Sequence, residues 1–295
     1  MATNNAEATA AGQFWDRRVR AAGDRVNWWS SDACTTHYNR GVCGQAVPGN
    51  SLGCRIALAA AAGRTLGRGI SVGAGAGDKE RALLKDAIVG EMQLWELSEA
   101  RAAEARRRAE ADGVGDRLKA RVGNAFTEET GSFDLVTWDH SLHHMPDIDQ
   151  ALAWSVERLN PGGWLMINDY FGPNRLQWRR DEVNLCNGVL DEIDRAHGTR
   201  LRRVRQSNII TRLRMKHRDP SEAPQSEAIA AAIARHLGPA THIKPVGGTV
   251  LNILGGIVVP AFPEDHPAIA TLVAADRDAL AQGQWHFGFT LWQKP

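Results

Sequence analysis

The sequence predicts an α/β protein built on a doubly wound parallel sheet. Apolar runs of strand length alternate with helical segments in units of about 30 residues between residues 65 and 172. The first apolar run, RGISV, leads directly into three closely spaced glycines. Such a strand–glycine–helix turn is typical of ligand sites at the carboxyl ends of parallel strands.

The elements follow one another in a clear order. The expected strands are RGISV, EMQLWELS, KARVGNAF, FDLVTWDH, WLMINDYFG, THIKPVGG and WHFGFTLWQ. The expected helices are RIALAAAAGRTLG, DKERALLKDAIV, EARAAEARRRAEADG, DIDQALAWSVERLNPGG, QSEAIAAAIARHLG and HPAIATLVAADRDALAQG. The alternation lapses after Gly172 and resumes near residue 225, so the stretch between is expected to be an insertion.

We therefore divide the chain into a tail, a lid and a core. Residues 1–12 are small, polar and rich in Ala, and we expect a disordered tail. Residues 13–64 are expected to form an N-terminal helical lid. Residues 65–295 form the core, with a helical insertion at about 173–222 as a second lid.

Composition narrows the class of protein. Lys+Arg 35 against Asp+Glu 34 gives a net charge of +1, without the basic excess of a general nucleic-acid binder. The four cysteines lack zinc-site spacing, which suggests reduced thiols. The N-terminus has no signal-peptide pattern, and the apolar runs are too short or too interrupted to cross a bilayer. We expect a soluble, cytoplasmic protein without stable membrane insertion.

The glycine loop SVGAGAGDKE predicts a nucleoside site. Gly73, Gly75 and Gly77 allow a sharp turn and a close approach of ligand to backbone. Glu96, 19 residues past Gly77, ends the second strand, where a carboxylate can accept both ribose hydroxyls. Asp78 stands where a dinucleotide site would have its third glycine, which favours a nucleoside cofactor over NAD.

Five segments in order strengthen this interpretation: SVGAGAG, LWELS, VGNAF, FDLVTWDHSLHHMPD and LNPGGWLMINDYFGP. Together they resemble class I S-adenosylmethionine-dependent methyltransferases, over roughly residues 65–172 and the final strand. The resemblance implies a mostly parallel, seven-stranded Rossmann-like sheet and S-adenosylmethionine as cofactor. NDYFGPNRLQW and GGTVLNILGGI look like bacterial enzymes that methylate sugars, glycoconjugates or natural products.

The resemblance implies roles for the first half of the site. Gly73, Gly75 and Gly77 would pass beside the methionine portion of the cofactor. Glu96, followed by Leu97, would hold the ribose. Ser71 stands where the family commonly has an acid, so contact with the methionine amino group could be weaker or rerouted.

The third and fourth strands would complete the cofactor site. By the same resemblance, Asn124 and Ala125 would meet the adenine, although the family often has Asp where Asn124 stands. Asp139 and His140 would line the methionine side.

The histidines of WDHSLHHMPD raise a question of metal binding. His140 and His144 are four residues apart, as in a helical HExxH zinc site. The usual Glu is missing, however, and Pro146 disfavours the continuous helix that such a site needs. We therefore predict no metal site.

A catalytic base is the favoured interpretation. A hydroxyl is a poor nucleophile until its proton leaves, and a histidine near its ordinary pKa suits that task. His143 follows the fourth strand and Asp169 ends the fifth, so the two could meet across the crevice. The pair resembles the His/Asp pair of sugar O-methyltransferases. His144 is the second candidate, Tyr170 could bond the substrate, and His143 could instead only shape the pocket.

The substrate side is less defined. Four residues could be lid or substrate contacts, or could pack an N-terminal helix on the core: Trp28, Trp29, His37 and Tyr38. The segment 200–218 holds seven Arg and one Lys, which suits either a solvated basic helix or an anionic acceptor. A homodimer is compatible with the sequence.

The predicted function is methyl transfer from S-adenosylmethionine to a hydroxyl of a small molecule, such as a sugar, a glycoconjugate or a natural product. The alternatives are N- or C-methylation within the same fold and a catalytically inactive cofactor-binding partner protein.

Overall fold

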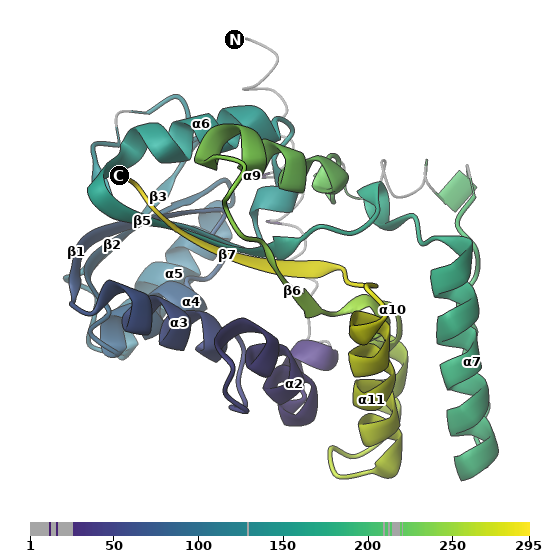
Figure 1. Ribbon diagram of the computed structural model, residues 1–295. Coiled ribbons are helices and arrows are strands. Elements are labelled where there is room, and N and C mark those ends of the chain that lie inside the picture. Colours follow the sequence, from purple (N-terminus) through teal and green to yellow (C-terminus); the bar gives the residue numbers. More distant parts are fainter. Residues whose placement is uncertain are drawn as a thin grey trace.

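The computed structural model describes residues 12, 16, 26–128, 130–208, 210, 211, 213, 219 and 221–295. Within these ranges the chain forms a seven-stranded sheet in the order β3-β2-β1-β4-β5-β7-β6 (Figure 1). The first five strands in this order are parallel to one another, whereas β7 runs antiparallel to its neighbours β5 and β6. The strands are β1 (Leu66–Val72), β2 (Val89–Glu96), β3 (Leu118–Val122), β4 (Phe133–Asp139), β5 (Leu159–Tyr170), β6 (Lys244–Gly247) and β7 (Phe287–Gln293). The predicted fold class is confirmed.

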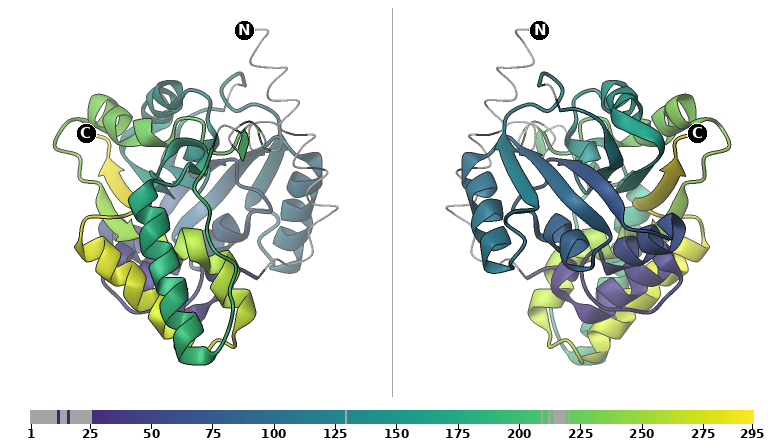
Figure 2. Two further views of the ribbon diagram at one scale, coloured as in Figure 1. Left: turned by 90° about the vertical axis from the view of Figure 1, so that its right-hand side faces the viewer. Right: turned by 90° about the vertical axis from the view of Figure 1, so that its left-hand side faces the viewer.

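Helices cover both faces of the sheet (Figures 1 and 2). One face carries α6 (Ile148–Arg158) and α9 (Ile229–Leu237), which share a core cluster with β4 and β5. The other face carries α2 (Asp32–Cys43), α3 (Leu52–Ala62), α4 (Asp78–Lys85), α5 (Glu99–Ala111), α10 (Thr249–Val258) and α11 (Pro267–Ala281). In the described part of the chain, no helix is both long and apolar enough to cross a membrane.

The third glycine of the loop serves helix packing. Gly77 precedes α4 with φ +68°, and a Cβ there would lie 2.7 Å from the Leu94 side chain on β2. A larger residue would push α4 away from the sheet, so glycine is required at this position for steric reasons.

The N-terminal region contributes to the core as well as to the site. Tyr38 of α2 and Leu58 of α3 are buried, and α2 packs against β6 and α11. Trp28 is also buried, and it lies so close to α10 that a Cβ on Gly255 would come within 2.6 Å of it. Residues 28–62 thus form a packed layer of the domain. The expected tail and the start of the expected lid lie outside the described residues, apart from Gly12 and Asp16.

The insertion is only partly helical. It contains α7 (Arg180–His197), which stands beside α10 and α11 beyond the edge of the sheet (Figure 1). α7 ends at Gly198, with φ +67°, and described residues 199–208 contain no helix. The expected basic helix is therefore wrong for this part. The Asp194 carboxylate accepts hydrogen bonds from the Thr199 hydroxyl and the Leu201 amide, which turns the chain back and ends the helix.

A buried carboxylate caps α10. The preceding residue, Gly248, has no side chain to cap the helix, and Asp276 of α11 does so instead. Its oxygens accept from the amides of Gly248 (2.8 Å) and Val250 (2.8 Å) and contact His37 Nε2 (3.0 Å). This contact joins α2, α10 and α11 and gives His37 a structural role.

Replacing this carboxylate should destabilise the fold. Asp276→Ala leaves buried amides unsatisfied, and we expect the free energy of unfolding to fall by about 2–4 kcal/mol, measured by urea denaturation. Asp278→Ala, at an exposed position of the same helix, is the matched control and should change it by less than about 0.5 kcal/mol. Equal effects of the two substitutions would contradict the capping role.

Candidate active site

The glycine loop and the ends of four parallel strands form one site. β1, β2, β4 and β5 all point their carboxyl ends to the same edge of the sheet. At the end of β1, Gly73 and Gly75 adopt φ +70° and +60°, a region that favours glycine. A Cβ on Gly73 would lie 3.1 Å from Ser141 Cβ, so the loop after β4 packs directly against the glycine loop.

Glu96 holds the glycine loop in place. Its Oε2 accepts from the Gly75 amide at 2.9 Å, and its Oε1 accepts from the amides of Leu97 (2.8 Å) and Ser98 (3.0 Å). A carboxylate has about four acceptor sites, so capacity is left for ribose hydroxyls. Leu97 thus takes part through its backbone.

The N-terminal segment reaches this end of β2. Asp16 Oδ1 accepts from the Ser98 hydroxyl at 2.5 Å and from the Ala100 amide at 3.2 Å. A Cβ on Gly12 would lie 2.5 Å from the Leu97 carbonyl oxygen. Residues 12 and 16 therefore lie against the start of α5, beside the carboxylate expected to hold the ribose.

Ser71, which stands where an acid was expected, contacts a carboxyl group from α4. The Ser71 hydroxyl donates to Glu80 Oε1 at 2.7 Å, and both residues are buried. Burial raises the pKa of the Glu80 carboxyl, against the opposing effect of the Ser71 hydrogen bond. A carboxyl from α4 thus lies beside the position where the family commonly has an acid.

The residues expected to meet the adenine form a compact turn after β3. Asn124 Oδ1 accepts from the Phe126 amide at 3.1 Å, which fixes the turn. Ala125 is buried in the core cluster beneath it. The amide oxygen keeps a second lone pair, so the predicted contact with an adenine amino group stays a prediction.

A network of hydrogen bonds runs from α4 to α2 through Asp139 and His140, the residues expected to line the methionine side of the cofactor. Lys79 Nζ donates to Asp139 Oδ1 at 2.9 Å, and Asn168 Nδ2 donates to the same oxygen at 2.8 Å. The Tyr38 hydroxyl donates to Asn168 Oδ1 at 2.6 Å, and Asn168 Nδ2 lies 3.2 Å from His140 Nε2. Burial, followed by the charge of Lys79, lowers the pKa of His140 to about 3, so the ring is neutral and its Nε2 can accept from Asn168.

Four rings pack together beside this network of hydrogen bonds and form an aromatic wall: those of Trp29, Tyr38, His140 and Phe287. The Trp29 ring centroid lies 4.5 Å from that of His140, 5.2 Å from that of Tyr38 and 5.7 Å from that of Phe287. Trp28 stacks behind Trp29 in the core. Of the residues expected on the substrate side, Trp29 and Tyr38 thus join the site, whereas Trp28 and His37 lie in the packed layer.

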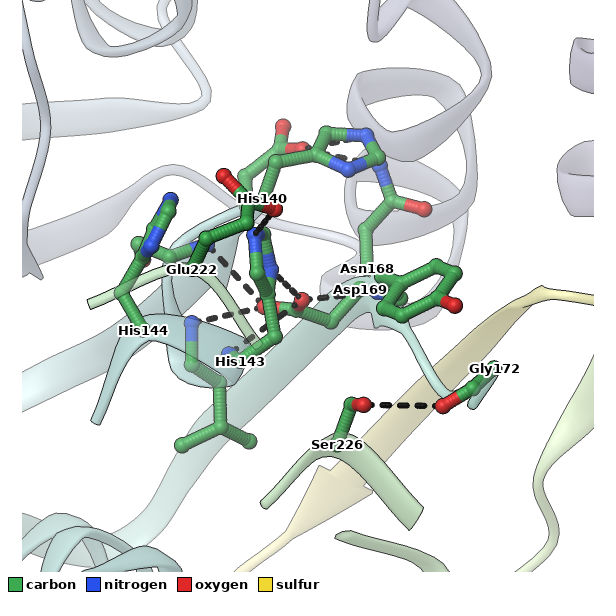
Figure 3. A network of polar contacts seen from close by, with 12 residues as sticks. His140, His143, His144, Asn168, Asp169, Gly172, Glu222 and Ser226 are labelled. Atoms are coloured by element: carbon green, nitrogen blue, oxygen red, sulfur yellow. Dashed lines mark hydrogen bonds and ion pairs between the residues drawn. The ribbon is translucent and has the colours of Figure 1, made fainter. Parts of the chain in front are cut away.

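His143 and Asp169 are in direct contact (Figure 3). His143 lies in the short 3-10 helix η2 (Leu142–His144), and its Nδ1 is 2.5 Å from Asp169 Oδ1. Asp169 is fully buried and also accepts from the amides of Ser141 (3.0 Å), Leu142 (2.7 Å) and Tyr170 (2.7 Å). These amides fix the carboxylate, which in turn fixes the ring.

The contact between the two side chains raises the pKa of His143 and lowers the pKa of Asp169. Burial alone would lower the pKa of His143, but the charge and hydrogen bond of Asp169 outweigh burial and raise it above 6.5. Burial alone would raise the pKa of Asp169, but His143 lowers it to about 2. The carboxylate is therefore ionised and holds the Nδ1 proton, which leaves Nε2 as the atom that exchanges a proton.

The other ring nitrogen of His143, Nε2, faces a residue that the sequence did not indicate. Glu222 Oε1, from the insertion, lies 3.8 Å from His143 Nε2 (Figure 3). The neighbouring His144 ring is 4.1 Å away between centroids, and its Nδ1 lies 3.0 Å from the Ser221 carbonyl oxygen. The Tyr170 hydroxyl donates to the Pro173 carbonyl oxygen, and its contact with a substrate stays a prediction.

These residues fit S-adenosylmethionine. The positive-φ glycines leave room for a ligand, the Glu96 carboxylate suits ribose hydroxyls, and the aromatic wall suits a sulfonium cation. Among the described residues, the buried Ser141 Oγ beside Gly73 has no hydrogen-bond partner, so the site offers a further polar group.

Comparison with known proteins agrees with this fit. Residues 70–165 match the family model of a methyltransferase domain. A ubiquinone/menaquinone biosynthesis C-methyltransferase of Cereibacter sphaeroides is 32% identical over 119 residues, which are 39% of this chain and 48% of that protein. Its counterpart in Dinoroseobacter shibae is 33% identical over 109 residues, 36% of this chain and 44% of that protein. The chain thus spans about half the length of the curated relatives it matches.

Two solved structures share the fold. The geranyl diphosphate C-methyltransferase of Streptomyces coelicolor, solved with Mg2+, geranyl diphosphate and S-adenosyl-L-homocysteine, has a TM-score of 0.51 at 13% identity. That match covers 82% of this chain and 80% of the other. Phospholethanolamine N-methyltransferase 2 of Haemonchus contortus has a TM-score of 0.54 at 16% identity, covering 96% and 60%. The chain has the fold of class I methyltransferases, and S-adenosylmethionine is the cofactor that its site fits.

Removal of the Glu96 carboxylate should weaken cofactor binding. Glu96→Ala deletes a charged acceptor, and hydrogen bonds to charged groups contribute about 1.5–3 kcal/mol, so we expect about 10- to 150-fold weaker binding of S-adenosylhomocysteine by calorimetry. Glu91→Ala, at an exposed position of the same strand, is the control and should bind as the unsubstituted protein does. Unchanged affinity in Glu96→Ala would contradict the ribose role.

Proposed function

We propose that the chain transfers a methyl group from S-adenosylmethionine to a hydroxyl of a small molecule, with His143 as the base and Asp169 as the group that orients it. The contact between His143 Nδ1 and Asp169 Oδ1, at the carboxyl ends of β4 and β5, carries the proposal. It lies beside the glycine loop, because Gly73 packs against Ser141, two residues before His143.

In this mechanism the cofactor supplies an electrophilic methyl group, and the protein's residues orient the acceptor and manage its proton. His143 Nε2 accepts the hydroxyl proton as the oxygen attacks. The imidazolium that forms is stabilised by the ionised Asp169, which keeps the Nδ1 proton throughout. The wall formed by Trp29, Tyr38, His140 and Phe287 keeps water from the methionine side.

The acceptor is proposed as a sugar, a glycoconjugate or another natural product, on the strength of the sequence resemblance. The basic segment gives limited support for an anionic acceptor. Arg203, one of its members, already pairs with Asp191 (2.5 Å) and Asp194 (2.8 Å), so its charge is compensated within the protein.

C-methylation is the second candidate, because the curated relatives named above are C-methyltransferases. The same pair could remove a proton from an acidic carbon or from a neighbouring hydroxyl. Tests with a phenolic ring and with an alcohol that has no acidic carbon distinguish the two candidates by the position of the methyl group in the product.

Disruption of the pair should reduce turnover without loss of cofactor binding. General-base catalysis contributes about 10²- to 10⁴-fold, so we expect His143→Ala and Asp169→Asn each to lower kcat within that range. Affinity for S-adenosylhomocysteine should stay near that of the unsubstituted enzyme. His236→Ala is the matched control, since it breaks another histidine–carboxylate contact, His236 Nε2 to Asp149 Oδ1 at 2.9 Å, on the surface. Near-normal turnover in both site variants would exclude the base.

The rate should depend on pH in a direction set by the His143 pKa. The protonated ring cannot accept a proton, so the rate is low below its pKa and rises as pH passes through it. Because Asp169 raises the pKa of His143 above 6.5, kcat/KM should rise with pH, with a midpoint above 6.5. A chelator is present in this measurement to remove metal ions. Asp169→Asn should move the midpoint to lower pH. A flat profile would contradict the assignment.

A further inference from the structure

Three metal-binding side chains converge on the substrate side of the pair. His143, His144 and Glu222 each offer a ligand atom, and these atoms lie within 4.8 Å of one another. The two histidines are consecutive in η2, whereas Glu222 comes from the insertion, 79 residues further along the chain than His143. The helical His140/His144 arrangement considered from the sequence is not needed here.

Both histidines have their Nδ1 atoms engaged away from the cluster. His143 Nδ1 lies 2.5 Å from the Asp169 carboxylate, and His144 Nδ1 lies 3.0 Å from the Ser221 carbonyl oxygen. A neutral imidazole that donates from Nδ1 has its lone pair on Nε2. Metal-ligating histidines have this arrangement, in which a carboxylate or a backbone carbonyl fixes the tautomer and the direction of the ring.

The loop that carries Glu222 is held against the rest of the site. Arg175 Nη1 donates to the Glu222 carbonyl oxygen at 3.2 Å, and the Arg175 amide donates to the Ala223 carbonyl oxygen at 2.7 Å. The same loop supplies the Ser221 carbonyl that orients His144. One anchored loop therefore provides both a candidate ligand and a group that orients another.

We propose that His143 Nε2, His144 Nε2 and the Glu222 carboxylate bind one divalent transition-metal ion such as Zn2+ or Fe2+. Two imidazoles and one carboxylate suit these ions, whereas Mg2+ prefers oxygen ligands. Tetrahedral ligands at about 2.0–2.1 Å from zinc lie about 3.3 Å apart. His143 Nε2 and Glu222 Oε1 are 3.8 Å apart, and the three ligand atoms all lie within 4.8 Å of one another. Side-chain movements of up to about 1.5 Å would bring them to this spacing. Three protein ligands leave a coordination position for solvent or for an acceptor oxygen.

The ion and the proposed base step require the same lone pair. An ion on His143 Nε2 prevents that atom from accepting the acceptor's proton. The consequence for activity rests on the proposed function: a bound ion should inhibit transfer by the metal-free enzyme. Binding of the ion itself does not depend on that function.

Binding is tested on the untagged, chelator-treated full chain. We expect Co2+ to bind with a stoichiometry of one, seen as visible absorption bands, and Zn2+ to displace it. Glu222→Gln and His144→Ala each remove a ligand and should weaken binding by about 100-fold or more. Asp169→Asn should weaken it by about 10- to 100-fold. His242→Ala, at an exposed histidine outside the cluster, is the control and should bind normally.

The outcomes separate the two proposals. Absence of saturable binding, or affinity that is unchanged in both Glu222→Gln and His144→Ala while their circular dichroism stays native, would overturn the ion site. The ion site would be supported if Zn2+ inhibits methyl transfer, and inhibits it less strongly in Glu222→Gln than in the unsubstituted enzyme. Stimulation by Zn2+ with the same dependence on Glu222 would support the site and overturn the role of His143 as base. Ion binding without transfer to any acceptor would overturn only the proposed function.

Discussion

The buried Asp169 carboxylate determines the geometry of the site. It accepts from three backbone amides and the His143 ring at distances of 3.0 Å or less. A buried carboxylate without such partners would cost several kcal/mol, so the strand end and the loop after β4 can only pack together in an arrangement that satisfies it. The loop in turn packs against Gly73, so the position of the glycine loop depends on the same carboxylate.

Two consecutive residues at the end of β5 contribute to opposite faces of the sheet. Successive side chains of a strand point to opposite faces. Asn168 points to α2, where it joins Tyr38 and His140, and Asp169 points to η2 and His143. The aromatic wall and the proposed base are therefore positioned by consecutive residues of a central strand. A shift of β5 by one residue would disrupt both at once.

The fold was predictable because its signals are local. Strand–helix alternation and the glycine turn lie within short windows, and the structure confirms the sheet that they indicate. The contact between His143 and Asp169 was also predictable, since the strands that carry them are adjacent in this fold class and end at the same edge of the sheet. Glu222 was not predictable, because no local pattern marks a half-buried loop residue that returns to a histidine 79 residues away. The end of α7 was missed although Gly198 is a local stop signal, since glycine readily adopts the positive φ of a helix end. The contacts of Asp194 with the residues that follow Gly198 leave no such mark in the sequence.

The position of β7 imposes an order on assembly. β7 lies between β5 and β6, although it is the last strand in the sequence, and Phe287 pairs with both Tyr170 and Gly247. Phe287 also belongs to the aromatic wall. During synthesis, β6 has no partner in the sheet until β7 has left the ribosome, and the wall lacks one side until then. The strands that carry the glycine loop and His143 with Asp169 can form earlier, but the aromatic wall is complete only after β7 has been inserted.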